Sequence, residues 1–403
     1  MPDWFIPSIE EFQSERATLL LGLNRALRHY RELTVPGIGG VWFVRQLSWG
    51  VAGISLAKEY SLKPAKVANA IEALACKMEW ETSDDYNKKG VRAFNRDSEM
   101  AIWSFRELSD KANYVQITYR QATVRALLGL NLTEGTRFNS MQLTAGKGRE
   151  LSEAFLSQSK SKIRFALVDW VNDRKTIKRT PLIREGLSGC SPSKEEKEVV
   201  KSILCSESTE DTADLSRRRR LIKSFGGSTV NCPSIEAIKK NLRQLCPDTA
   251  QKQIDDIDIA ILFDKMLDCG REVIYTCAQL ISKQATPSSD KLVKNQELNS
   301  AIKRLLKAAE YYSLAKGTRH PDARKFSEEI LASATDSAAC LRKLILRDTN
   351  ILDISGEKVI EGYLFDRRKE LGSPDSPQEK VGSEESSTET KIRQLFELWG
   401  DCQ

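Results

Sequence analysis

Apolar residues recur every three or four positions through most of this 403-residue chain, and this spacing is the strongest constraint on its fold. Val67, Ile71, Leu74 and Met78 would form one stripe along a helix that begins at Pro64, because proline is tolerated in a first helical turn. Ser193 and Glu196 form a capping box that predicts another helix start. The sequence therefore predicts a mainly α fold with at most a few short strands.

One segment departs from the helical pattern, "TEGTRFNSMQLTAGKGRELSEAFLSQ" at residues 133–158. Within it, "RFNSMQLT" has the character of a strand, with Met141 and Leu143 on one side. Two glycines then bracket Lys147, and a helix with an apolar face follows. The segment resembles the "LTxxGRxLxEAF" ending of winged helix-turn-helix proteins, and the resemblance extends over about residues 115–156. The matching residues are Leu143, Thr144, Gly148, Arg149, Leu151, Glu153, Ala154 and Phe155.

The resemblance implies that the helix before the strand, "TYRQATVRALLGL", is a recognition helix. Cationic side chains contact phosphates and guanine, and amide side chains contact adenine, so this helix and the wing have suitable residues. The predicted contacts are Arg120, Gln121, Arg125, Arg137, Lys147 and Arg149. Winged helices also serve as protein-docking units, and this alternative remains open.

A run of four arginines, Arg217, Arg218, Arg219 and Arg220, is the strongest electrostatic feature of the chain. On a helix these side chains would point in all directions, so some would face any nearby surface. They could contact phosphates, or they could pair with acidic residues of the same chain. Both interpretations stay open.

The last part of the chain changes character. Residues 372–390, "GSPDSPQEKVGSEESSTET", have almost no large apolar side chain, which predicts a disordered acidic and serine-rich linker. Residues 391–403 then form an amphipathic helix with Ile392, Leu395, Phe396 and Trp399 on one face. Such a helix docks either on the chain's own body or on a protein partner.

The length fits two or three domains. We expect a helical domain with a winged-helix-like unit over residues 1–158 and a helical bundle over residues 159–371, followed by the linker and the C-terminal helix. Absence of a long apolar run and of a secretory signal in the sequence predicts a cytoplasmic protein without a membrane partner.

Catalytic chemistry is not recognisable in the sequence. His29 and His320 are the only histidines, which leaves little for histidine-based hydrolysis, and the nine cysteines form no metal-binding pairs. The glycines of "VPGIGG" lack the lysine of a phosphate-binding loop, so we interpret them as a turn that lets the next helix pack closely. The sequence predicts no cofactor, no metal and, with less force, no enzymatic activity.

Two functional hypotheses follow. The first is a non-enzymatic protein that binds nucleic acid, duplex DNA rather than RNA, through the wing and the basic patches. The alternative is a helical adaptor or accessory subunit of a larger complex, such as a bacterial antiviral-defence or mobile-element system, without nucleic-acid contact of its own.

Overall fold

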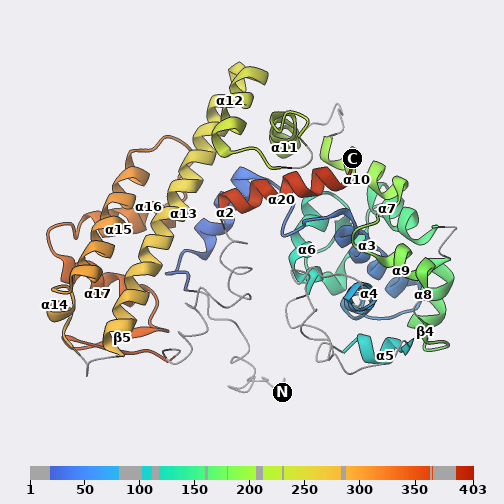
Figure 1. Ribbon diagram of the computed structural model, residues 1–403, viewed down its shortest axis with the longest axis horizontal. Coiled ribbons are helices and arrows are strands. Elements are labelled where there is room, and N and C mark those ends of the chain that lie inside the picture. Colours follow the sequence, from blue (N-terminus) through green and yellow to red (C-terminus); the bar gives the residue numbers. More distant parts are fainter. Residues whose placement is uncertain are drawn as a thin grey trace, which may run out of the picture. The chain divides into compact units, whose positions relative to one another are not determined.

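The structure, a computed structural model, describes residues 19–80, 102–110, 118–158, 162–178, 180–205, 212–228, 231–282, 287–363, 365 and 387–403. The described part of the chain is mainly α-helical, with three small two-stranded antiparallel sheets (Figure 1). This confirms the predicted fold class. Most of the predicted linker, residues 372–390, lies outside the described residues. Across the described ranges, every helix is too short or too polar to cross a membrane.

The chain divides into two compact units, and each is built from separate stretches of sequence. Unit 1 comprises residues 1–34 and 251–390, and unit 2 comprises residues 35–250 and 391–403. The division differs from the one expected at residue 158, which falls inside unit 2. The physical reason is that helix α7 (Lys147–Leu156) packs against α3 (Val44–Glu59) and α10 (Lys194–Cys205), so residues on both sides of position 158 share one core.

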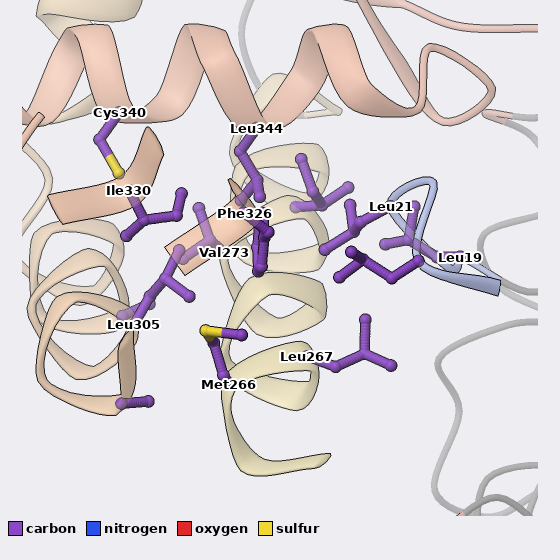
Figure 2. Close-up of a cluster of buried hydrophobic side chains, with 14 of the residues drawn as sticks. Leu19, Leu21, Met266, Leu267, Val273, Leu305, Phe326, Ile330, Cys340 and Leu344 are labelled. Carbon is purple, nitrogen blue, oxygen red and sulfur yellow. The ribbon is translucent and has the colours of Figure 1, made fainter. Parts of the chain in front are cut away.

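Unit 1 is organised around the long helix α13 (Pro247–Ile281). Its inward residues, such as Met266, Leu267 and Val273, pack with Leu305 and Phe326 in a continuous apolar core (Figure 2). Leu19 and Leu21, which precede the first described helix, lie in the same core. Burial of these side chains, at about 25 cal/mol per Å² of apolar surface, is the main force that joins the two sequence segments of the unit.

The other elements of unit 1 surround this core. They are α2 (Asn24–Thr34), α14 (Ser289–Leu292), α15 (Gln296–Leu314), α16 (Pro321–Leu331), α17 (Ser337–Arg347), β5 (Leu352–Ser355) and β6 (Lys358–Glu361). The two strands pair in antiparallel register, with Ser355 opposite Lys358. Gly356 has a φ of +63° at the first position of the two-residue turn, which a residue without a Cβ adopts at no steric cost. Residues 352–361 therefore form a β-hairpin.

In unit 2 two helices form the centre. The helix α3 is buried along most of its length, as the apolar segment after the glycine turn predicts. The next helix, α4 (Pro64–Trp80), begins at the predicted proline. The two helices approach so closely that a Cβ on Gly53 would lie 2.5 Å from the Cβ of Ala68. Small residues at this crossing therefore set the distance between the helix axes.

The remaining elements of unit 2 pack on α3 and α4 or on one another. They are β1 (Ile102–Trp103), α5 (Phe105–Leu108), α6 (Tyr119–Gly129), β2 (Thr133–Glu134), the 3₁₀ turn η2 (Phe138–Ser140), β3 (Gln142–Leu143), α7, α8 (Ile163–Val171), β4 (Ile177–Lys178), α9 (Pro181–Leu187), α10, α11 (Ala213–Ser224), α12 (Ile235–Leu245) and most of α20 (Thr388–Asp401). At α10 the predicted capping box is present. The Ser193 hydroxyl accepts from the Glu196 N–H at 3.2 Å, and Glu196 Oε2 accepts from the Ser193 N–H at 2.8 Å.

Candidate nucleic-acid interface

The N-terminus of α6 is fixed by two polar side chains of α4. The carboxylate of the buried Glu72 accepts from the N–H groups of Tyr119 and Arg120, at 2.6 and 2.9 Å. Asn69 Oδ1 accepts from Thr118 Oγ1 at 3.2 Å. A negative charge at this position complements the positive end of the helix dipole and satisfies N–H groups that lack acceptors within the helix. The helix is therefore held in one position by α4.

Two faces of α6 are covered by the rest of unit 2. The loop with Gly37, Gly39 and Gly40 lies against one face, where Gly40 N–H donates to the Ala122 carbonyl at 2.9 Å. A Cβ on Gly129 would lie 2.5 Å from Gly37 Cα, so backbone meets backbone there. The second face packs on α3, where Leu127 contacts Gly50. The glycine turn thus serves close packing, as its sequence predicts.

The outer face of α6 remains exposed to solvent. Gln121, Arg125 and Leu128 are exposed and are spaced by four and three residues, so they form a single stripe. The side chain of Arg125 makes no hydrogen bond or ion pair with the described residues. Two of the predicted contacts, Gln121 and Arg125, therefore lie where a ligand could reach them.

Arg120, a further predicted contact, is used inside the protein instead. Its Nε donates to Asn69 Oδ1 at 2.7 Å, and its guanidinium lies 5.0 Å from the ring centroid of Phe138. Burial lowers the pKa of Arg120 from its ordinary value, and the nearby Glu72 opposes that shift. The side chain joins α6 to α4 and to the turn η2, so Arg120 is corrected from a phosphate contact to a structural residue.

A hairpin follows α6, as the resemblance implies, but its strands are short. β2 and β3 pair in antiparallel register, with Thr133 opposite Leu143 and Glu134 opposite Gln142. The first half of the expected strand "RFNSMQLT" forms η2 rather than extended chain. There Ser140 Oγ donates to the Arg137 carbonyl at 2.9 Å, and the Phe138 side chain is buried. We call residues 135–141, which connect the two strands, the wing loop. Arg137 is exposed in it.

The start of α7 explains why threonine and glycine stand in the winged-helix-like motif. Thr144 Oγ1 donates to the Asn131 carbonyl at 3.0 Å and accepts from the Gly148 N–H at 3.1 Å. A Cβ on Gly148 would overlap the Leu132 carbonyl oxygen. These contacts lock the hairpin to α7. Beside them, Lys147 and Arg149 are exposed, and Lys147 pairs with Glu150 at 2.7 Å in a surface ion pair.

The four arginines of α11 are largely withdrawn from solvent. Arg218 is buried, and its Nη1 donates to the Pro36 carbonyl at 2.9 Å. Arg217, Arg219 and Arg220 are half-buried, and burial lowers the pKa of Arg220. The expectation of a phosphate-binding run is therefore corrected for Arg218, which supports the loop before α3. The run of charges alone did not indicate which of the four arginines would bind the loop at Pro36.

The apolar face of α20 packs on the protein itself. Ile392, Leu395 and Phe396 are buried, and the Phe396 ring lies 5.4 Å from that of Phe225. Trp399 is half-buried, with Lys201 Nζ at 5.5 Å from its ring centroid. The sequence leaves open whether this helix docks on its own chain or on a partner, and in the structure it docks on its own chain. These four residues are thus corrected from partner-binding residues to core and near-core residues of unit 2.

Other polar clusters were not predicted. The rings of His29 and His320 lie 5.3 Å apart in unit 1, although the two residues are distant in sequence. Asp256 is buried and accepts from the Thr318 N–H at 2.9 Å. Within the described ranges no three His, Cys, Asp or Glu side chains converge on a possible metal position.

No family model matches the chain, and no curated protein or solved structure is significantly similar to it.

Proposed function

We propose that unit 2 binds duplex nucleic acid, DNA rather than RNA, through the outer face of α6, the wing loop and the start of α7. The observation that carries the proposal is the exposure of Gln121, Arg125, Arg137, Lys147 and Arg149 on these three consecutive elements. The surrounding protein holds the elements rigidly, through Glu72 at one end and Thr144 at the other. Elements whose backbone is already fixed lose little backbone entropy when they bind a ligand.

The charge of this surface remains available to a ligand. Arg125, Arg137 and Arg149 form no side-chain ion pair with the described residues. Lys147 pairs with Glu150, but the two side chains are 45% and 50% exposed, and exposed pairs contribute about 0–1 kcal/mol. A phosphate can therefore displace Glu150 at small cost. Gln121 supplies an amide of the kind that reads adenine in the major groove.

The test is a fluorescence-anisotropy titration of a labelled DNA duplex at several salt concentrations. If all four cations neutralise phosphates, the slope of log K against log salt should be about −3.6, since each contact contributes about 0.9. The variant Arg125→Glu/Arg137→Glu/Arg149→Glu should bind at least a hundredfold more weakly. A duplex RNA of equal length should bind more weakly than the DNA, because its deep, narrow major groove does not admit a helix.

A charge-matched control separates local contacts from net charge. Lys303→Glu/Lys307→Glu/Arg324→Glu changes the net charge equally at exposed positions of unit 1. This control should retain most of the affinity. Equal losses in the two triple variants, or no salt-dependent binding at micromolar protein, would refute the proposal.

A further inference from the structure

Unit 1 contains a cavity of about 440 Å³ between the starts of two helices. Gly22, Asn24, Arg25 and Arg28 line it from α2 and the loop before that helix, and Asp322 and Lys325 line it from α16. Arg347, the last residue of α17, completes the lining. The volume lies within the range of about 300–1,000 Å³ that is typical of small-molecule sites.

Positive charge predominates in the lining of the cavity. Arg25, Arg28 and Lys325 are exposed, and their side chains make no hydrogen bond or ion pair within the described part of the chain. Arg347 differs, because its Nη2 lies 2.6 Å from Glu329 Oε2 and its Nη1 donates to the Leu21 carbonyl at 3.2 Å. The charge of Arg347 is thus neutralised by Glu329, and its side chain only lines the cavity. Three free cations and the carboxylate of Asp322 leave a net charge of +2 in the cavity.

Backbone groups at the start of α2 add to this field. Asn24 is the first residue of the helix and lines the cavity, and the Leu27 N–H donates to the Leu23 carbonyl at 2.9 Å in the first turn. The N–H groups before Leu27 have no acceptor within the helix, and they carry the positive end of its dipole. At α16 the Asp322 N–H instead donates to His320 Nδ1 at 3.2 Å, so that helix end is capped by its own side chain.

We propose that this cavity binds the phosphate group of a small phosphorylated ligand. Two guanidinium groups can each hold phosphate oxygens through paired N–H donors, and the ammonium of Lys325 supplies a third contact. The net charge of +2 matches a phosphate monoester, which carries about −1.5 to −2 at neutral pH. The site lies in unit 1 and shares no residue with the proposed duplex-binding surface, so either proposal can fail without the other.

The test is isothermal titration of the full-length protein with inorganic pyrophosphate. Arg25→Ala/Arg28→Ala should weaken binding by about a hundredfold, and Lys325→Ala by about tenfold, since hydrogen bonds between charged partners are the strongest kind. Arg324→Ala is the matched control, because Arg324 is an exposed cation on the same helix that does not line the cavity. Asp322→Asn removes a repulsive charge and should tighten binding severalfold.

Competition identifies the source of the phosphate. Displacement of pyrophosphate by ATP would support a small-molecule ligand. Binding of a short 5′-phosphorylated oligonucleotide with no binding of pyrophosphate would overturn the proposal, as would absence of pyrophosphate binding at millimolar concentration. An equal loss in Arg324→Ala would also overturn it. The substituted cations are exposed, so unchanged melting temperatures should accompany the alanine variants.

Discussion

A buried ion pair beneath α7 gives the sharpest prediction about the stability of unit 2. Arg45 on α3 and Glu196 on α10 have side chains that are 1% and 0% exposed, and Arg45 Nε lies 3.1 Å from Glu196 Oε1. Arg45 also donates to the carbonyls of Gly186 and Ser191, the latter at 2.8 Å, and its guanidinium lies 5.2 Å from the Phe155 ring centroid. One arginine thus joins α3 to α7, α9 and α10.

The two partners should respond differently to substitution. Arg45→Met keeps the apolar volume but leaves the Glu196 carboxylate buried without its cation, which should cost about 3–5 kcal/mol of unfolding free energy. Glu196→Gln retains an oxygen for the Ser193 N–H and leaves Arg45 with its carbonyl acceptors, so it should cost about 1–3 kcal/mol. The double variant should cost less than the sum of the two by about 1–3 kcal/mol, because neither charge is then buried alone.

Urea unfolding followed by tryptophan fluorescence measures these costs in the relevant unit. Six of the seven tryptophans lie in unit 2, so the signal reports mainly on that unit. Phe155→Leu is a useful control, since it changes the packing under the guanidinium without changing charge. Strictly additive losses, or a loss below about 1 kcal/mol for Arg45→Met, would show that water reaches the pair and that the reasoning is wrong.

Three further predictions concern other sites. Burial raises the pKa of Asp264 to about 6, so folding disfavours its carboxylate and the stability of unit 1 should fall by about 3 kcal/mol as pH rises from about 4 to above 6. Asp264→Asn should therefore raise the melting temperature in calorimetry at pH 8 and give no gain near pH 4; a gain that is independent of pH would contradict this. Gly53→Ala should destabilise unit 2 by about 1–3 kcal/mol in urea, because its Cβ would lie 2.5 Å from that of Ala68. Phe396→Ala should cost about 3–5 kcal/mol, and a smaller loss than about 1 kcal/mol would mean that α20 contributes little to the core.

The elements that the sequence predicts well are those whose signals are local. The start of α4 at Pro64 and the capping box at Ser193 and Glu196 depend on residues within one turn of each other, and both are present. The packing of α20 on its own chain was one of two options for an amphipathic helix. On that helix Phe396 packs against Phe225, and no local pattern connects the two residues.

The division into units and the phosphate cavity could not be predicted, since both depend on contacts between distant segments. Residues 19–34 belong with residues after 250, although composition does not change at residue 34. In the same way, Arg25 and Arg28 acquire a cavity only because α16 packs near α2. In the sequence, each of these arginines is indistinguishable from an ordinary exposed residue of a helix.

The glycine loop before α3 shows why charge in a sequence is an ambiguous sign of phosphate binding. A peptide carbonyl and a phosphate both offer oxygen acceptors, and a cation satisfies either. Arg218 donates to the Pro36 carbonyl, and Lys391 donates to the Gly39 carbonyl. The loop needs such donors because the carbonyls of Pro36 and Gly39 belong to no helix or strand. A run of arginines near a glycine-rich turn can therefore be part of the scaffold, and the exposed stripe of α6 is the better guide to a ligand. The salt dependence of duplex binding should accordingly be lost on substitution of Arg125, Arg137 and Arg149, whereas Arg218→Ala should lower the melting temperature and leave the salt slope unchanged.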